Sequence, residues 1–395
     1  MTVRIGREFL SIPGPTNIPD EILNAMHRPA IEIYSGRLQE ITQSSVQDLA
    51  KIFCTDGHVY IYIANGHGAW EAALTNTLSR GDKILVLESG RFATAWGDMG
   101  VPLGLAPEVL SGNWRGAIDL DALEERLRGD AAGEIKAVLV VQVDTASGVA
   151  NDIAGVRRAL DSSGHPALLM VDTIASLATM PFEMDKWGVD VAVSGSQKGL
   201  MMPPGLSFVA ASSKAQATHK KSNLRTQYWD WTAREGGEHY LKYCGTPPVH
   251  MLFALRKSLD MLFEEGLDNV YKRHAILADA VHEAVDRWAS QNTLEINIQN
   301  PSERSVSVTT VLVKEPYDPA TLLNFCEEIC GVVLGIGIGE LGKRAFRIAH
   351  MGYVNAPMVL GTLSVIETGL QVLDIPYGKG GIQASIDSLA NSLAD

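Results

Sequence analysis

Residues 136–143 (KAVLVVQV), 167–172 (ALLMVD) and 189–196 (VDVAVSGS) are short runs dominated by apolar residues, and they decide the fold. A strand that is apolar on both sides must be covered on both faces, as in a parallel sheet between two layers of helices. One further apolar run and two amphipathic stretches alternate with these three, at 83–88, 119–128 and 152–162. The alternation predicts an α/β fold with a mostly parallel sheet between helices. Ligands bind such sheets beyond the carboxyl ends of the strands, so the residues after each strand are candidate site residues.

The last third of the chain predicts a second, smaller α+β unit. In a helix expected at 271–289, apolar residues recur along one face, at Leu277, Val281, Val285 and Trp288. The other elements expected there are a helix at 247–264, strands at 305–313, 331–338 and 345–349, and helices at 319–330 and 356–372. We therefore predict three parts: an extended N-terminal arm (1–20), a large domain (21–270) and a small C-terminal domain (271–395).

The composition is that of an ordinary globular protein. The 395 residues are 46% hydrophobic and 20% charged, which excludes a disordered chain. The 33 Lys and Arg against 46 Asp and Glu give a net charge of −13, so we expect no nucleic-acid partner. The N-terminus lacks a signal-peptide pattern, and no apolar run approaches the roughly 18 residues of a membrane helix. These features predict a cytoplasmic protein without a membrane partner, and the four cysteines read as free thiols.

Lys198 lies in the most informative stretch, SGSQKGLMMPPG (194–205). It directly follows a predicted buried strand and is flanked by glycine and small polar residues, unlike an ordinary surface lysine. Such a lysine loses its proton more readily and can form an imine with an aldehyde. A loop lysine at the rim of the fold is the alternative, and this motif alone does not separate the two.

Two further features suggest what Lys198 could hold. Asp172 ends the strand before it, and a buried carboxylate there needs a cationic partner such as a protonated pyridine nitrogen. Residues 64–71 (ANGHGAWE) lead from a predicted strand into a helix, whose first N–H groups can bind an anion. Taken singly, these features also fit a structural aspartate and a plain Gly-rich turn.

Together the motifs resemble the class V aminotransferases, which have pyridoxal phosphate (PLP) fold type I. The resemblance rests on PGPTNIP (13–19), GHGAWEAALTN (66–76), VDTIASL (171–177), SGSQKGLMMPPGLSF (194–208) and KRAFRIAHMG (343–352). They occur in the family's order over nearly the whole chain. Within the class the chain is most similar to serine–glyoxylate and alanine–glyoxylate aminotransferases.

The resemblance implies roles for individual residues around a PLP cofactor. Lys198 would hold the cofactor covalently and move the proton, and Asp172 would pair with the pyridinium nitrogen. Phe92 would stack on the ring, although taken alone it reads as a core residue, and Thr145 would bond the phenolate side. The implied phosphate-binding positions are Asn65 (often Ser or Thr in the family), Gly66, His67 and Gln197. Tyr243 and Thr246 resemble residues that reach the phosphate of the neighbouring subunit, which implies a homodimer with shared active sites.

The substrate side of the site is implied in the same way. Arg347 matches the arginine of the family's F-R-I motif, whose guanidinium binds a substrate carboxylate bidentately. A surface strand arginine is the alternative, and Arg344 is expected to be solvated. The implied substrate-binding positions are Arg347, Thr145, Tyr34 and Pro15, the last in an arm that covers the substrate.

We therefore predict ping-pong transfer of an amino group from a small amino acid, serine or alanine, to glyoxylate or pyruvate. One departure weakens the choice of substrate: Ile33 and Tyr34 stand where glyoxylate enzymes usually have His and Arg. A tyrosine there resembles pyridoxamine–pyruvate aminotransferase, although Ile338 stands where that enzyme has an additional arginine. An aminotransferase of the aspartate–glyoxylate or ureidoglycine–glyoxylate type is a further alternative.

Three further functions fit the residues less well. A cysteine desulfurase-like lyase needs a mobile cysteine, but Cys326 and Cys330 lie in a helix-like stretch. A nucleotide-binding oxidoreductase is suggested by the glycines at 335, 337 and 339, but these lack a following helix and a ribose-binding acid. A non-enzymatic module that merely retains PLP is disfavoured by the intact set of Lys198, Asp172 and Arg347.

Overall fold

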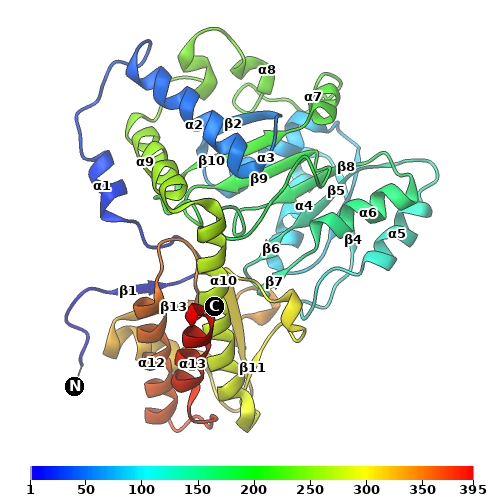
Figure 1. Ribbon diagram of the computed structural model, residues 1–395. Helices are drawn as coiled ribbons and strands as arrows, with labels where there is room; N and C mark the ends of the chain where they lie inside the picture. Colours follow the sequence, from blue (N-terminus) through cyan, green and yellow to red (C-terminus); the bar gives the residue numbers. More distant parts are fainter. Residues whose placement is uncertain (1, 395) are drawn as a thin grey trace.

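A seven-stranded sheet forms the centre of the larger part of the protein in the computed structural model, which describes residues 2–394 (Figure 1). Its strand order is β2 (His58–Ala64), β10 (Gly205–Ala211), β9 (Val191–Gly195), β8 (Leu168–Asp172), β5 (Ile135–Val141), β3 (Lys83–Leu87) and β4 (Ala106–Leu110). Only β10 runs antiparallel to its neighbours, β9 and β2. The prediction of an α/β fold with a mostly parallel sheet is confirmed.

Two helical layers cover this sheet because alternate residues of each strand face opposite sides. In β3, Leu85 and Leu87 pack in one core and Ile84 and Val86 in the other. The first core is closed by α2 (Arg37–Phe53), α5 (Leu120–Arg128), α6 (Ile153–Ser163) and α9 (Val249–Glu265), with α1 (Asp20–Met26) against α9. The second is closed by α3 (Gly66–Thr77), α4 (Arg91–Leu103) and α7 (Ser213–His219). Short segments complete this part: β6 (Val143–Asp144), β7 (Val149–Ala150), α8 (Trp231–Arg234) and a 3-10 turn at His239–Tyr243.

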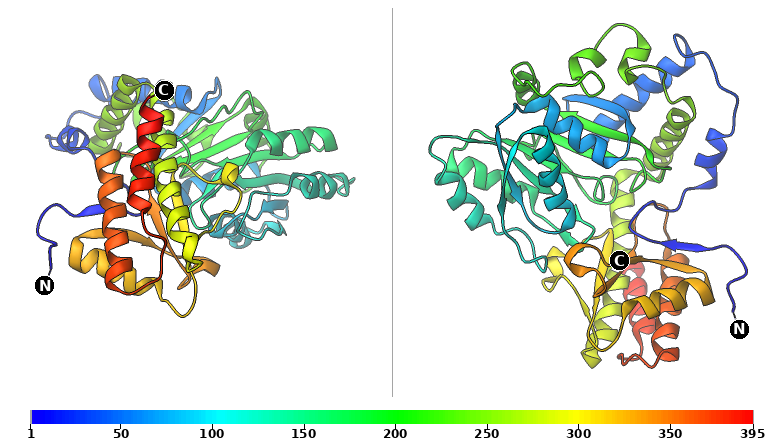
Figure 2. Two further views of the ribbon diagram at one scale, coloured as in Figure 1. Left: turned by 60° about the horizontal axis from the view of Figure 1, so that its bottom comes forward. Right: turned by 180° about the vertical axis from the view of Figure 1, so that it is seen from behind.

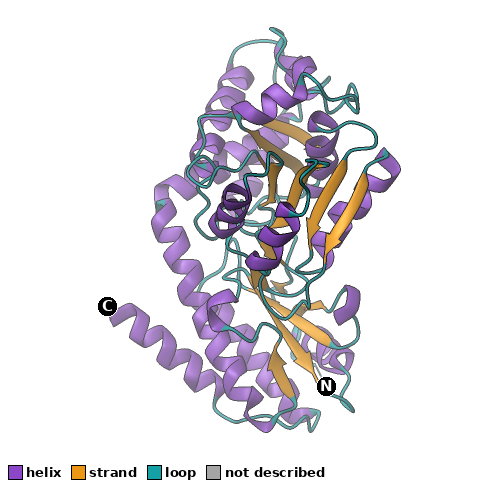
Figure 3. Cartoon of the chain, turned by 90° about the vertical axis from the view of Figure 1, so that its right-hand side faces the viewer, coloured by secondary structure: helices purple, strands orange, loops and turns teal. Residues whose placement is uncertain are grey.

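A five-stranded sheet forms the smaller part, below the first sheet in Figure 3. Its order is β1 (Phe9–Ser11), β13 (Val332–Ile336), β14 (Ala345–Ala349), β12 (Val308–Val313) and β11 (Leu294–Ile296). Helices α10 (Leu267–Trp288) and α12 (Ala356–Val372) pack on it, and α13 (Gly381–Ala394) packs against these two helices (Figure 2). The apolar face predicted for α10 is buried: Leu277, Val281, Val285 and Trp288 are each at most 3% exposed.

The N-terminal arm is part of this second sheet. It contributes β1, which pairs in parallel with β13, so that Phe9 lies opposite Val332. The arm was expected to be extended, and its pairing could not be foreseen because three residues carry too little pattern. From β1 the chain passes along the larger part to α1 (Figure 2).

Several elements differ from the sequence-based expectation. The helix expected at 319–330 is α11 (Pro319–Asn324) followed by a π-helical turn at Phe325–Ile329, and α10 starts four residues earlier than expected, after Gly266. Helices α2, α4, α7, α8 and α13 and strands β1, β4, β10 and β11 were among the elements not predicted. In α4, Gly97, Gly100 and Pro102 hide the helical pattern, and β4 is a half-exposed edge strand. Among residues 2–394, no helix has both the length and the apolar character needed to cross a membrane.

Candidate active site

A cavity of about 110 Å³ lies beyond the carboxyl ends of β5, β8 and β9. Strands that run in parallel end at the same sheet edge, so residues far apart in sequence meet there. The cavity brings together seven of the predicted cofactor residues: Gly66, His67, Phe92, Thr145, Asp172, Gln197 and Lys198. Trp70, Val141, Val143, Ile174 and Ala175 complete the lining.

Lys198 occupies the connection between β9 and the antiparallel β10. This connection is held tightly, because Met201 N donates to Lys198 O and Ser196 Oγ donates to Pro203 O. The side-chain nitrogen of Lys198, Nζ, donates a hydrogen bond to the backbone oxygen of Pro13. Burial, together with the nearby positive charge of Arg347, lowers the pKa of Lys198 to about 8. Near neutral pH, a larger fraction of this amine is therefore neutral than of an ordinary lysine.

The N-terminal arm lies directly on this lysine. A methyl group on Gly14 would come within 2.5 Å of Lys198 Nζ, so only glycine allows the backbone to pass there. The next residues hold the arm in place: Thr16 N donates to Gln197 O at 3.1 Å, and Thr16 Oγ1 donates to Lys198 O at 3.1 Å. Pro15 lies between Gly14 and Thr16, in the segment of the arm that contacts Lys198.

Asp172 is buried at the end of β8, and both of its carboxylate oxygens accept hydrogen bonds. Ile174 N donates to Oδ1 at 2.6 Å and the indole Nε1 of Trp70 donates to Oδ2 at 2.7 Å. Burial raises the pKa of Asp172 to about 7, and these two donors oppose that rise. Trp70 stands in the quoted GHGAWE motif, but nothing in the sequence indicated this contact.

Arg347 lies in β14, and its side chain reaches across to the larger part of the protein. Nε donates to Ile336 O at 2.7 Å and Nη1 donates to Thr145 O at 2.9 Å. Within residues 2–394, Nη2 has no hydrogen-bond partner. The residue is only 8% exposed, and burial lowers the pKa of Arg347 to about 10, against the opposing charge of Asp144. This arginine is therefore a buried cation and differs from a solvated strand arginine.

Asp144 is a buried carboxylate that the sequence analysis missed. Oδ2 accepts from Phe92 N at 2.9 Å and Ala93 N at 3.0 Å, and Oδ1 accepts from Ala146 N at 2.9 Å. It thereby ties the first turn of α4, which carries Phe92, to the loop that carries Thr145. Burial raises the pKa of Asp144 to about 6, while these backbone donors and Arg347 lower it.

One end of the cavity is formed by the start of α3 and by Gln197. The Asn65 side chain caps the helix by accepting from His67 N at 3.1 Å and Gly68 N at 3.4 Å, and Asn65 does not line the cavity. Gln197 Oε1 is buried without a partner. A methyl group on Gly195 would lie 3.1 Å from that oxygen and 3.8 Å from Gly66 N. This oxygen only accepts hydrogen bonds, so a phosphate would have to be held by the amide NH₂ group of Gln197 and by the N–H groups at the start of α3.

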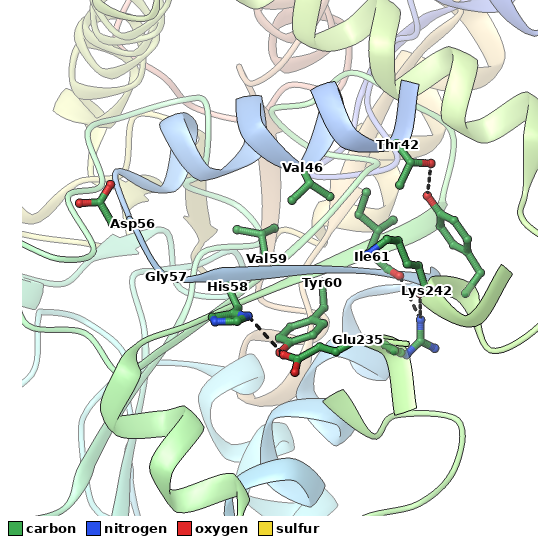
Figure 4. Close-up of a pocket in the computed structure, with 12 residues that line it drawn as sticks. Thr42, Val46, Asp56, Gly57, His58, Val59, Tyr60, Ile61, Glu235 and Lys242 are labelled. Atoms are coloured by element: carbon green, nitrogen blue, oxygen red, sulfur yellow. Dashed lines mark hydrogen bonds and ion pairs between the residues drawn. The ribbon is translucent and has the colours of Figure 1, made fainter. Parts of the chain in front are cut away.

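Three predicted residues lie away from this cavity. Tyr34 is 61% exposed and packs edge-on against Tyr240, and Thr246 is also exposed. Tyr243 is buried, and its hydroxyl pairs with Thr42 Oγ1 at 2.7 Å. It lines a larger cavity of about 310 Å³ between α2 and β2 (Figure 4). Polar groups there already pair with one another, since Glu235 accepts from Tyr60 at 2.6 Å, and the lysine and aspartate of this cavity, Lys242 and Asp56, are exposed.

The structure also bears on the readings set aside above. None of the four cysteines lines the smaller cavity, and burial raises the pKa of Cys326 to about 12, which suppresses its thiolate. The glycine run at 335–339 leads into a 3-10 turn of three residues, Gly339–Leu341, rather than into a dinucleotide-binding helix. Within residues 2–394, no cluster of His, Cys, Asp and Glu could hold a metal ion.

Lys198 and Asp172 thus line one cavity at the strand ends of the larger sheet, and Arg347 reaches its edge from the smaller sheet through Thr145. Residues 10–339 match the family Aminotransferase class-V, and the chain belongs to this family. It is therefore a transaminase enzyme of the class that its motifs resemble, and the predicted family is confirmed.

Curated relatives span the whole chain. It is 39% identical to serine–glyoxylate aminotransferase of Methylorubrum extorquens, over 100% of this chain and 99% of that protein. It is 37% identical to L-aspartate–glyoxylate aminotransferase of Paracoccus denitrificans, over 95% and 94% of the two chains. Among solved structures, pyridoxamine–pyruvate aminotransferase of Mesorhizobium loti shares the fold, with a TM-score of 0.89 at 24% identity over 99% and 100% of the chains.

Proposed function

We propose that this enzyme uses PLP to move the amino group of a small amino acid, serine or alanine, to glyoxylate or pyruvate. The observation that carries the proposal is that Lys198 and Asp172 line one cavity, and that Arg347 is held beside it by its hydrogen bond to Thr145 O. The full-length likeness to a serine–glyoxylate aminotransferase supports the choice of substrates.

The residues around the cavity fit the parts of PLP. Asp172 would face the ring nitrogen, Phe92 and Thr145 would flank the ring, and Gln197 with the start of α3 would hold the phosphate. When bound, PLP supplies an electron sink that stabilises negative charge on the amino acid's α-carbon. The protein supplies orientation, charge balance and proton transfer.

Lys198 is the group that would move the proton. A general base works best when its pKa lies near the operating pH, and the pKa of Lys198 is lowered to about 8. The arm over Nζ, held through Thr16 and including Pro15, keeps bulk water from the amine. Exclusion of water favours proton transfer between the amine and the substrate over hydrolysis.

Arg347 would bind the substrate carboxylate. Two of its nitrogens are fixed by backbone oxygens, which orients the guanidinium and leaves Nη2 to meet an anion. Asp144, buried nearby, balances the charge of the arginine when no substrate is bound. The geometry selects ligands that carry a carboxylate.

The proposal includes a homodimer with shared active sites, in the cytoplasm. Tyr34 and Thr246 are exposed and lie away from their own chain's cavity, which suits residues that act on a neighbouring subunit. For Tyr243 to reach the neighbouring phosphate, its hydroxyl must exchange Thr42 for that partner.

Tyr34 also favours a second candidate. Because a tyrosine replaces the arginine usual in glyoxylate enzymes, a pyridoxamine–pyruvate reaction is the alternative that this residue favours, and an aspartate– or ureidoglycine–glyoxylate reaction is an alternative on other grounds. The Paracoccus relative supports the aspartate variant.

A half-reaction screen tests these proposals. Serine, alanine, aspartate and pyridoxamine are each mixed with the holoenzyme, and conversion of the cofactor to its amine form is followed spectroscopically. Glyoxylate, pyruvate and oxaloacetate then test the return reaction. We expect serine or alanine with glyoxylate or pyruvate to react fastest; fastest conversion by aspartate or pyridoxamine would instead establish the alternative.

A further inference from the structure

Trp70 is the side chain that supports Asp172. Within residues 2–394, it is the only side chain that donates a hydrogen bond to that carboxylate, from Nε1 to Oδ2 at 2.7 Å. The indole is 1% exposed. It stacks on Trp96, with ring centroids 6.0 Å apart and planes 16° apart, and it contacts His67 and Phe92 edge-on or tilted. Its donor is therefore held in one orientation.

The carboxylate needs this donor because its surroundings favour the neutral form. Asp172 is 2% exposed, and a buried carboxylate with too few donors takes up a proton. The charged and titratable groups that face it are Asp144, which disfavours ionisation, Lys198, which favours it, and His67 in the same cavity. Burial raises the pKa of Asp172 to about 7, so one hydrogen bond decides its charge at neutral pH.

We propose that Trp70 is a positioning residue that keeps Asp172 ionised and aims its carboxylate into the cavity. Under the proposed function, on which this inference rests, only the ionised form can pair with a protonated ring nitrogen. Trp70 would thus control whether the site binds its cofactor in the reactive protonation state, without itself moving a proton.

The test compares Trp70→Phe with a matched control, Trp96→Phe. Both remove a buried indole N–H from the same stack, but Trp96 Nε1 has no hydrogen-bond partner within residues 2–394. The ionisation of Asp172 is followed in the cofactor-free protein by the infrared C=O stretch of its protonated form, assigned by its loss in Asp172→Asn. We expect the pH midpoint of the Asp172 titration to rise by roughly one pH unit in Trp70→Phe and to stay unchanged in Trp96→Phe.

PLP affinity gives the second readout, by calorimetry across the same pH range. We expect Trp70→Phe to bind roughly tenfold more weakly near neutral pH and to recover at higher pH, where Asp172 ionises without help. In the Asp172→Asn background, the substitution at Trp70 should have no further effect on affinity.

Two results would overturn the inference: an unchanged infrared midpoint in Trp70→Phe, or a loss of affinity that is equal at every pH. A wild-type protein that binds no PLP would overturn the proposed function instead, and the cofactor-free infrared titration would still decide the role of Trp70.

Discussion

At the scale of single residues, the site brings the pKa values of two charged groups, Lys198 and Asp172, close to neutral pH. Burial lowers the pKa of Lys198 to about 8 and raises that of Asp172 to about 7, so each can change its charge near the pH of the cell. Arg347 stays charged with a pKa of about 10. The site therefore has one permanent cation for a carboxylate and two groups whose charge responds to what is bound.

Replacing Lys198 with alanine should abolish covalent attachment of PLP, because no other amine lines the cavity within residues 2–394. The adduct is trapped with borohydride and located by mass spectrometry. Lys214→Ala is the control, since that lysine binds Asp190 and Ala167 O at 3.2 and 2.9 Å, away from the site. An adduct of undiminished yield in Lys198→Ala would show that a different lysine holds the cofactor.

Arg347→Ala should lower kcat/KM for both amino acid and oxo acid by roughly ten- to a hundredfold, the value of a charge-assisted hydrogen bond. Steady-state kinetics with each substrate measure this loss of kcat/KM. Arg344→Ala removes an exposed arginine three residues away and should leave these constants unchanged. Equal KM values in Arg347→Ala and wild type would remove the arginine from the substrate site.

At the scale of elements, the start of α4 is built around Asp144. Helix N-termini favour a carboxylate because their first N–H groups have no partner within the helix. In α4, the carboxylate that accepts from these N–H groups belongs to Asp144 of β6. Gly90 leaves space for it because glycine has no side chain. A methyl group on Gly90 would lie 2.3 Å from Asp144 Cγ.

Gly90→Ala should therefore destabilise the fold by about 1–3 kcal/mol, because Asp144 must leave its three backbone donors or α4 must shift. Urea unfolding of the cofactor-free protein measures the loss. Gly237→Ala is the control, since a methyl group there meets no atom within 4 Å. If both variants unfold at the same urea concentration, the close packing of Asp144 on Gly90 has no energetic consequence.

At the scale of the whole molecule, buried histidines near the junction of the two sheets make stability depend on pH. His274 accepts from Gly352 N at 3.0 Å and donates to Val270 O at 2.7 Å, so it must be neutral. Burial lowers the pKa of His274 to about 3 and that of His350 to about 4, and the pKa of His282 also falls well below its ordinary value.

A depressed histidine pKa means that the unfolded chain binds more protons as pH falls below about 6.5. Each histidine should therefore remove stability from that pH downward, until its folded-state pKa is reached. Asp172 and Asp144 act in the opposite sense, since their pKa values rise on folding. The histidine contribution is isolated by substituting one histidine and leaving the carboxylates intact.

We expect His350→Gln to reduce the loss of unfolding free energy between about pH 7.5 and 5.5 by roughly 1 kcal/mol relative to wild type. Urea unfolding at the two pH values gives this difference, whatever stability the substitution itself removes at pH 7.5. His58→Gln, which changes a half-exposed histidine on β2, serves as the control. An unaltered pH dependence in His350→Gln would show that His350 is not neutral in the folded protein.

Much of this protein was determined by the sequence itself. Apolar runs that alternate with amphipathic helices specify a covered parallel sheet, and such a sheet brings its strand ends to one edge. Asp172, Thr145 and Lys198 follow three of those strands, so their meeting could be predicted. The F-R-I motif likewise indicated Arg347, although not the backbone oxygens that orient it.

Only the tertiary structure decided how these residues are held. Trp70 donates a hydrogen bond to Asp172, Lys198 donates one to Pro13 O, and Asp144 accepts one at the start of α4. Each of these hydrogen bonds joins two segments, and the local sequence pattern of one segment does not indicate its contact with the other. Periodicity and turn residues report a residue's own element, whereas these contacts depend on the angle and depth at which α3, α4 and the arm pack on the sheet. Those quantities are set by the packing of the whole core, and therefore appear only once the chain is folded.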